Sequence, residues 1–326
     1  MDTARLEIND SNIDKAGEII RRGGLVAFPT ETVYGLGADA LNADAVRSVY
    51  AAKGRPSDNP MIVHIADIEA LTTVADLDCC MNHDVVKAMM REFWPGPITF
   101  VMRKRAVVPL TTTGGLDTVG IRMPSSETAR RFIRASQRPI AAPSANISGR
   151  PSPTTYQDVL EDMDGRIDAV LLGEKCAVGI ESTVLDITGD VPTILRPGYV
   201  TPEMIAAFTD VEYDPALYGS PVSGDFRPKA PGMKYKHYAP KAQVRIVKHE
   251  AYAEILAKEA EEDGKKVQIL DYHGDSHAAA RDFFARLREL DRKGADLILV
   301  IALDDEEFGF SVMNRMLKSA GYDVAD

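Results

Sequence analysis

The hydrophobic pattern divides the chain into two α/β regions. In residues 244–320, the apolar runs VRIVKH, VQILDY and LILVIAL alternate with polar segments whose apolar residues recur at helical spacing. This order predicts a β-α-β-α-β-α array, which is a small domain built on a parallel sheet. Upstream, short apolar runs and amphipathic segments also alternate, which predicts a larger α/β domain over residues 1–210.

Between these regions, residues 211–240 lose all periodicity. This stretch of thirty residues contains five prolines and three glycines. It is too long for a passive connection inside a compact domain, so we interpret it as a linker or functional loop before a second domain at 241–326. Its end, PGMKYKHYAP, mixes lysines with aromatic rings and can fold over an anionic ligand.

Residues 28–40, FPTETVYGLGADA, are the stretch around which the chain is organised. An apolar run at 25–28 ends in a proline and is followed by hydroxyls, the Glu31 carboxylate and two glycines. Open α/β sheets hold ligands where buried strands end, so we interpret this stretch as the wall of a small-molecule site. The alternative is an ordinary strand-to-helix loop whose polar residues face water.

Cations occur at two positions that an ordinary protein surface does not explain. Lys53 and Arg55 flank one glycine in KGRPSDNP, between a helix end and prolines, which suits an anion clamp. Alternatively, they complement the negative end of the preceding helix. Arg122 stands inside the apolar strand VGIRMP, so it needs an anionic partner if it is buried.

Neutral donors follow two other predicted strands. The PSANISG turn at 143–149 gathers hydroxyls, an amide and a glycine, as an anion-binding nest does. No G-x-x-x-x-G-K-[ST] sequence occurs, so a nucleotide would be held in another way. Ser182 in GIESTVLD lacks a G-x-S-x-G elbow, so we interpret its hydroxyl as a ligand donor or a strand cap.

Composition narrows the class of protein. At 326 residues, with 45% apolar and 27% charged residues, the chain is long enough for two soluble domains. No apolar run approaches the ~20 residues of a membrane span and no signal peptide is evident, so we expect a cytoplasmic protein. The net charge of -11 disfavours tight, nonspecific nucleic-acid binding.

His273 and His277 lack an evident third ligand and the three cysteines form no C-x-x-C pair, so no protein-held metal is expected.

In nine blocks that stand in the same order, the chain resembles the long, two-domain form of the threonylcarbamoyl-AMP synthase family. The blocks cover essentially the whole sequence, and they are FPTETVYGLGADA, KGRPSDNPMIVHI, FWPGPITFVM, VGIRMP, PSANISG, GIESTVLD, ILRPG, PGMKYKHYAP and GFSVMNRMLKSA. Any one block is a weak signal, whereas nine in register are a strong one.

The resemblance implies an α/β fold with an N-terminal concave, twisted sheet (YrdC-like), a smaller C-terminal Rossmann-like parallel domain and a linker that closes the site. It implies a nucleotidyltransferase that condenses L-threonine, bicarbonate or CO2 and ATP into threonylcarbamoyl-AMP with release of pyrophosphate. The product would pass to a separate tRNA-modifying complex that acts next to the anticodon. Neither stable nucleic-acid binding nor membrane contact is expected.

The resemblance also implies site residues, carried over motif by motif. Lys53 and Arg55 would be catalytic cations. The expected threonine contacts are Thr32, His64, Arg122, Ala142 and Ser182, and the expected ATP contacts are Arg55, Asn59, Thr118, Ser144, Ser152, Arg196 and Tyr235. Glu31 or Glu181 would at most orient donors.

Every participant in this reaction is anionic, so positioning and positive charge should supply most of the catalysis. Mg2+ is expected on the phosphates of ATP, held mainly by ATP and water.

An alternative from another class is a module that cradles double-stranded RNA and assists translation. Salt-dependent RNA binding without ATP turnover would favour that alternative. A nearer alternative is a different carbamoyl or acyl adenylation on the same fold.

Overall fold

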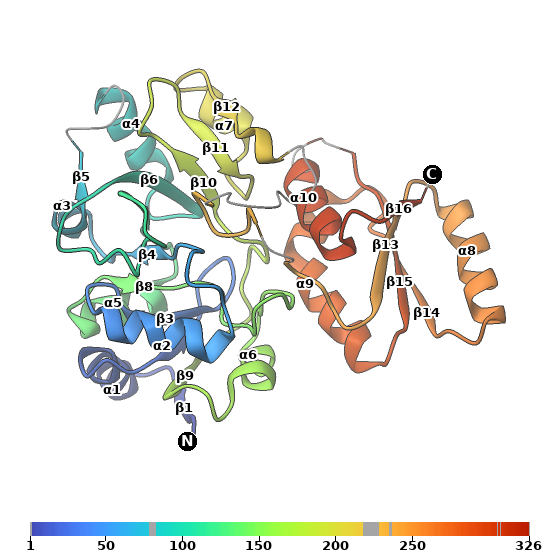
Figure 1. The fold of residues 1–326 in the computed structure, drawn as a ribbon, viewed down its shortest axis with the longest axis horizontal. Coiled ribbons are helices and arrows are strands. Elements are labelled where there is room, and N and C mark those ends of the chain that lie inside the picture. The colour runs from blue at the N-terminus through green and yellow to red at the C-terminus, as the bar shows by residue number, and fades with distance from the viewer. Residues whose placement is uncertain are drawn as a thin grey trace.

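The computed structural model describes residues 2–77, 83–217, 228–234, 237–304, 306 and 308–325. Figure 1 shows two α/β units side by side, with the large sheet in the first and a small sheet in the second. The expected order of a large N-terminal unit followed by a small parallel one is therefore confirmed.

The first unit is built on a mixed sheet of twelve strands within the described residues. Eleven of them run in the order β1-β9-β2-β3-β8-β4-β7-β6-β10-β11-β12, and β5 pairs with β6 at one side. The strands are β1 (Ala4–Glu7), β2 (Val26–Phe28), β3 (Gly35–Asp39), β4 (Ile62–His64), β5 (Ala75–Asp76), β6 (Ile98–Lys104), β7 (Thr118–Arg122), β8 (Ile140–Ala141), β9 (Ala169–Leu172), β10 (Thr183–Asp186), β11 (Thr193–Arg196) and β12 (Glu212–Tyr213).

Helices cover this sheet and supply much of its apolar core. They are α1 (Asp10–Arg21), α2 (Ala43–Lys53), α3 (Leu71–Val74), α4 (His83–Phe93), α5 (Glu127–Ser136), α6 (Tyr156–Met163) and α7 (Pro202–Ala206), with short 3-10 turns η1 (Ile68–Ala70) and η2 (Pro215–Leu217). Trp94 follows α4 and packs edge-on against Phe100 in the core.

Strand register brings the ends of several strands to one place. β4 and β7 run parallel with His64 opposite Arg122, so both side chains stand at the same edge. β11 runs antiparallel to β10, which sets the end of β11 at Arg196 beside the start of β10. Residues that are far apart in sequence therefore meet at one edge of the sheet.

The two glycines of FPTETVYGLG, Gly35 and Gly37, lie in a strand. β3 pairs antiparallel with β2, with Gly35 opposite Phe28. A Cβ on Gly37 would approach the Ile140 Cγ2 atom to 2.8 Å, so glycine is required for the close approach of β3 to its neighbours. The polar residues between β2 and β3 therefore form a tight connection, and its position against the sheet is fixed from both sides.

The second unit has four parallel strands in the order β14-β15-β13-β16 among the residues described. Its elements are β13 (Gln243–Val247), α8 (Glu250–Glu262), β14 (Val267–Leu270), α9 (Ser276–Arg292), β15 (Leu297–Ile301), α10 (Gly309–Ala320) and β16 (Val324–Ala325). Figure 1 shows α8 on the outer face of this sheet and α9 and α10 on the face toward the first unit. None of the helices in the described ranges is long and apolar enough to span a bilayer.

Candidate active site

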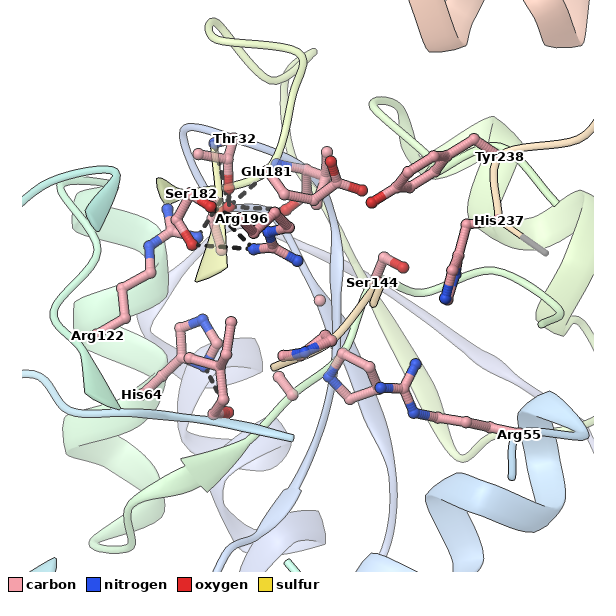
Figure 2. Close-up of a pocket in the computed structure, with 18 residues that line it drawn as sticks. Thr32, Arg55, His64, Arg122, Ser144, Glu181, Ser182, Arg196, His237 and Tyr238 are labelled. Atoms are coloured by element: carbon pink, nitrogen blue, oxygen red, sulfur yellow. Dashed lines mark hydrogen bonds between the residues drawn. The ribbon is translucent and has the colours of Figure 1, made fainter. Parts of the chain in front are cut away.

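A small cavity lies where these strand ends meet the C-terminal end of the linker (Figure 2). Its walls come from the β2–β3 connection, β4, β7 and β8 with the turn after it, and the start of β10 and end of β11. The lining residues are Thr30, Thr32, Val33, Gly35, Arg55, Ile62, His64, Arg122, Ala142, Pro143, Ser144, Glu181, Ser182, Arg196, Pro231, Gly232, His237 and Tyr238.

Pro231, Gly232, His237 and Tyr238 cover the cavity on one side. Lys234 Nζ lies 3.0 Å from Asp58 Oδ2, and the backbone N–H of Ala239 donates to the Gly149 carbonyl at 2.8 Å, so this segment is docked on the first unit. The enclosed volume is about 60 Å³. Ligand pockets usually measure roughly 300–1,000 Å³, so in this conformation the cavity is smaller than a typical nucleotide site.

One end of the cavity is built around Arg122. Its Nη2 lies 2.6 Å from Glu31 Oε1, and its Nη1 donates to Thr32 Oγ1 at 2.9 Å. Both charged side chains are buried, and this is the anionic partner that the sequence requires for a buried Arg122. Burial opposes ionisation of Glu31, but the charge of Arg122, its hydrogen bond and the nearby backbone hydrogen bonds together outweigh burial and hold the pKa of that carboxyl below its ordinary value.

His64 completes this end as a neutral ring. Its Nδ1 lies 3.2 Å from the Ile62 carbonyl, and the ring is buried edge-on to Phe28. Burial, with a smaller contribution from the charge of Arg122, lowers the pKa of His64 to about 3. The imidazole is therefore uncharged at neutral pH and can only donate or accept hydrogen bonds there.

This low pKa predicts a measurable change of stability with pH. An unfolded histidine titrates near pH 6.5, so the unfolded state binds the proton first and His64 destabilises the fold as pH falls toward 3. A His64→Gln variant lacks this term. Its free energy of unfolding should improve relative to wild type by roughly 2 kcal/mol between pH 7 and pH 5, measured by urea denaturation. A difference that stays constant with pH would show that His64 keeps an ordinary pKa.

Ser182 and Arg196 form the middle of the cavity wall. Arg196 donates from Nη2 to the Ser182 carbonyl at 2.9 Å and to Ser182 Oγ at 3.3 Å. Ser182 Oγ also lies 2.8 Å from Thr99 Oγ1. Arg196 is buried, so it presents its charge to the cavity with little screening by water.

The other end of the cavity is marked by Arg55 and His237, whereas the predicted ATP contact Asn59 lies on the same loop as Arg55 but is absent from the lining. Arg55 donates from Nη2 to the Pro60 carbonyl at 3.0 Å, and burial lowers its pKa to about 10, so it stays cationic at neutral pH. Within the described chain, Asn59 Oδ1 and His237 Nε2 are buried without a hydrogen-bond partner. Buried polar atoms of this kind are uncommon and indicate a place where a ligand or water completes the hydrogen bonds.

Lys53 lies behind the cavity wall and is absent from its lining. Its buried Nζ donates to the backbone carbonyls of Ser144 and Asn146. These bonds fix the turn on which Ser144 reaches the cavity, where Ser144 Oγ donates to Asn146 Oδ1 at 2.5 Å. The structure therefore gives Lys53 a positioning contact, and its predicted role as a catalytic cation of the anion clamp stays a prediction.

The remaining predicted residues lie in three different situations. Ser152 does not line the cavity, but its Oγ donates to Glu181 Oε1, which does, at 2.6 Å. Thr118 is the first residue of β7 and is likewise absent from the lining. Tyr235 falls outside the described residues. Thr32, Arg55, His64, Arg122, Ala142, Ser144, Ser182 and Arg196 are all brought to the cavity.

Glu181, His237 and Tyr238 line the cavity although the predicted ligand contacts do not include them. Burial and the charge of Arg55 lower the pKa of His237, so this ring is neutral as well. The signal for the two rings was present in PGMKYKHYAP, whose aromatic and basic residues suggest a ligand cover. No sequence pattern shows which of its rings would face inward.

Comparisons with known proteins agree with this geometry. A family model described as "Telomere recombination" matches residues 18–198, and a second, "Threonylcarbamoyl-AMP synthase, C-terminal domain", matches residues 200–321. The threonylcarbamoyl-AMP synthase of Pyrococcus abyssi is 45% identical, with 98% of this chain and 97% of the relative covered. The chain belongs to the threonylcarbamoyl-AMP synthase family.

Other members extend the likeness over the whole molecule. The threonylcarbamoyl-AMP synthase of Bacillus subtilis is 40% identical, with 98% of this chain and 96% of the relative covered. The crystal structure of Pyrococcus abyssi Sua5 complexed with L-threonine superposes with a TM-score of 0.93 at 43% identity, covering 99% of each chain. The family, the fold class and the reaction class predicted from the sequence are therefore confirmed.

Proposed function

We propose that the cavity lined by Arg55, Arg122 and Arg196 binds L-threonine and ATP and condenses them with bicarbonate or CO2 into threonylcarbamoyl-AMP. Pyrophosphate leaves, and the adenylate passes to a separate complex that modifies tRNA next to the anticodon. One observation carries this proposal: a single cavity joins an end with Arg122 and neutral hydrogen-bonding groups to a cationic end with Arg55 and Arg196. An amino acid and a nucleotide phosphate fit these two ends.

The threonine end combines one cationic side chain with neutral polar and apolar side chains. Arg122 is the cation there, so it would attract the carboxylate of the amino acid. The hydroxyls of Thr32 and Ser182 and the neutral ring of His64 would contact the polar groups that remain, and Ala142 would contact the apolar part. The threonine-complexed archaeal relative, with its TM-score of 0.93, supports this assignment.

The nucleotide end uses Arg55 and Arg196 for charge and neutral residues for orientation. Asn59 Oδ1, buried without a partner in the described chain, can accept a hydrogen bond from the amino group of adenine. Ser144 and Ser152, whose hydroxyls donate to Asn146 and Glu181 in this structure, are proposed ATP contacts, and Thr118 and Tyr235 complete the proposed set. Lys53 acts through the turn that carries Ser144.

Mg2+ would enter with ATP. Two carboxylates near the cavity are the candidate protein ligands for this ion. Glu31 faces Arg122, and Glu181 faces Arg315. Because both are committed to arginines, they fit poorly as ligands of a protein-held metal. The proposed Mg2+ therefore has phosphate oxygens and water as ligands, which is the usual preference of this ion.

The chemistry requires no covalent intermediate between the substrate and the enzyme. The threonine amine first forms a carbamate, and a carbamate oxygen then attacks the α-phosphate while the bond to pyrophosphate breaks. The hydrogen bonds of Ser182 among the described residues join Thr99 and Arg196, neither of which is a general base. Arg55 and Arg196 would stabilise the charge that develops on the phosphates.

Pyrophosphate release with each substrate omitted in turn tests this proposal. ATP, Mg2+, bicarbonate and L-threonine together should give turnover, and omission of any one, or addition of EDTA, should abolish it. L-serine lacks one methyl group and should react with kcat/KM lower by about 10- to 200-fold. Pyrophosphate release that ignores threonine, or salt-dependent RNA binding without turnover, would contradict the proposal.

A further inference from the structure

Helix α10 of the second unit sends a buried arginine to the wall of the cavity. Arg315 is 0% exposed, and its Nε lies 3.2 Å from Glu181 Oε2. Its Nη1 donates to the carbonyls of Pro197 and, at 3.2 Å, Ser311. Arg315 thus contacts the segments on either side of Ser182 and Arg196, although it belongs to a different unit of the protein.

The position of α10 is fixed where it meets the first unit. Ser311 Oγ donates to the Gly198 carbonyl at 2.8 Å, and the rings of Phe308 and Tyr199 stack with centroids 4.7 Å apart. A Cβ on Gly198 would approach the Thr183 nitrogen to 2.3 Å, so the chain there runs directly against the start of β10. Arg315 is therefore held against a rigid part of the site.

Glu181 connects Arg315 to the groups that face the ligand. Its Oε1 accepts a hydrogen bond from Ser152 at 2.6 Å, and Figure 2 shows its carboxylate pointing toward Tyr238. Burial, the charge of Glu181 and a hydrogen bond to it raise the pKa of Tyr238 to about 12. One carboxylate therefore joins the second unit, the proposed ATP contact Ser152 and a ring of the cover.

Charge balance shows why Arg315 matters for this arrangement. Burial opposes ionisation of Glu181, but Arg315 and then Arg196 outweigh it and keep its pKa below the ordinary value. Without Arg315, Arg196 would be the main cation facing the buried Glu181 carboxylate. Arg196 would then be drawn from its place beside Ser182, and the proposed phosphate site would lose a cation.

Arg315 also retains hydrogen-bonding capacity beyond these contacts. Its Nη2 is buried without a hydrogen-bond partner in the part of the chain that the structure describes. A purely structural buried arginine is expected to have its donors satisfied. An unsatisfied donor beside the cavity wall indicates a role in a site that ligand or water completes.

Building on the proposed function, we propose that Arg315 is a positioning residue for adenylation. It holds Glu181, and through Glu181 it sets Ser152, Tyr238 and Arg196 for ATP. The second unit is then part of the active site: it supplies a cation that the first unit alone lacks at this place. The threonine end at Arg122 does not depend on it.

Two variants and one control test this inference on the full-length protein. Arg315→Gln removes the charge, and Arg315→Lys keeps it. Arg292→Gln is the control, because Arg292 also crosses from the second unit to the first, 2.8 Å from Asp158, but away from the cavity. The measurements are ATP affinity by calorimetry, kcat and KM for both substrates, and thermal unfolding.

Arg315→Gln should weaken ATP binding and lower kcat/KM for ATP by up to about 100-fold, the usual scale for a displaced active-site group. The KM for threonine should change by less than about threefold on the same reasoning. Arg315→Lys should recover part of the loss, and Arg292→Gln should resemble wild type. A folded Arg315→Gln protein with wild-type ATP affinity and kcat/KM would overturn the inference.

A double variant covers the case in which Arg315→Gln is too unstable to measure. Glu181→Gln with Arg315→Gln leaves neither charge buried without its partner, so stability should return. ATP affinity should recover only in part, because Arg196 is no longer drawn toward a buried carboxylate while Ser152 and Tyr238 still lack the Glu181 carboxylate. A full return to the wild-type affinity would overturn the inference. Calorimetry needs no turnover, so an inactive wild type that binds ATP would contradict the proposed reaction while the effect of Arg315 could still be read.

Discussion

An Arg55→Ala variant is expected to lose about 100-fold or more in kcat/KM for ATP while remaining folded. Arg55 lines the cavity and is half-buried, and among the described residues its guanidinium donates to the backbone carbonyls of Asn59 and Pro60. Its removal takes a cation from the proposed phosphate site without breaking an ion pair in the described part of the chain. Pyrophosphate release at several ATP concentrations measures the loss, and circular dichroism checks the fold.

Arg47→Ala is a suitable control for this experiment. Arg47 lies on the exposed side of α2, the helix that leads to Arg55, and pairs with Asp44 three residues away. Surface pairs of this kind contribute little, so this variant should turn over as the wild type does. If Arg55→Ala retained near-normal turnover, Arg55 would not be part of the phosphate site.

Lys53→Ala should behave differently from Arg55→Ala. The lysine holds two backbone carbonyls of the turn that carries Ser144, so its removal should also lower stability. A loss of activity without any change of stability would instead favour direct contact between Lys53 and the phosphates.

The second large effect concerns the buried pair of Glu31 and Arg122. Arg122→Gln leaves the Glu31 carboxylate buried without its cation, which should cost about 3–5 kcal/mol of unfolding free energy. It should also abolish measurable threonine binding, because the proposed partner of the substrate carboxylate is gone. Urea denaturation and calorimetry with L-threonine measure the two effects separately.

The double variant Glu31→Gln with Arg122→Gln distinguishes binding from folding. With both charges removed, most of the lost stability should return. Threonine binding should not return, because the glutamines cannot supply a positive charge. Recovery of threonine affinity in this double variant would mean that Arg122 only supports the fold.

The sequence predicted most of the cavity because its chemistry is local in the chain. FPTETVYGLG, VGIRMP and PSANISG each place polar groups at strand ends, and Thr32, Arg122 and Ser144 do reach the cavity. The buried partner of Arg122 could be anticipated from the cost of burying a charge, and the structure supplies Glu31. These predictions rest on physical constraints that act within a few residues.

Other features depended on tertiary packing that no local pattern encodes. Lys53 and Arg55 look alike in KGR, yet one turns to the carbonyls behind the wall and the other to the cavity. The glycines of FPTETVYGLG carry no strand pattern of their own, but neighbouring strands make them part of β3. The predicted boundary at residue 210 remains a prediction, and β12 at Glu212–Tyr213 still pairs with the first sheet.

The contact between the second unit and the site is the clearest example of a feature that the sequence pattern does not predict. Its β-α-β-α-β-α pattern was readable, but its contact with the site was not, because Glu181 and Arg315 are 134 residues apart. Val33 of the β2–β3 connection and Ile180 even belong to the apolar cluster of the second unit. Long-range contacts of this kind require the folded structure.

The most direct test of the account is the mass of the product made from carbon-13 bicarbonate. Wild-type protein with ATP, Mg2+ and L-threonine should give threonylcarbamoyl-AMP heavier by the one labelled carbon, with pyrophosphate formed in equal amount. Arg55→Ala should give almost none. AMP or ADP without a labelled adenylate, from protein that binds both substrates, would contradict the claim that this cavity joins threonine, bicarbonate and ATP.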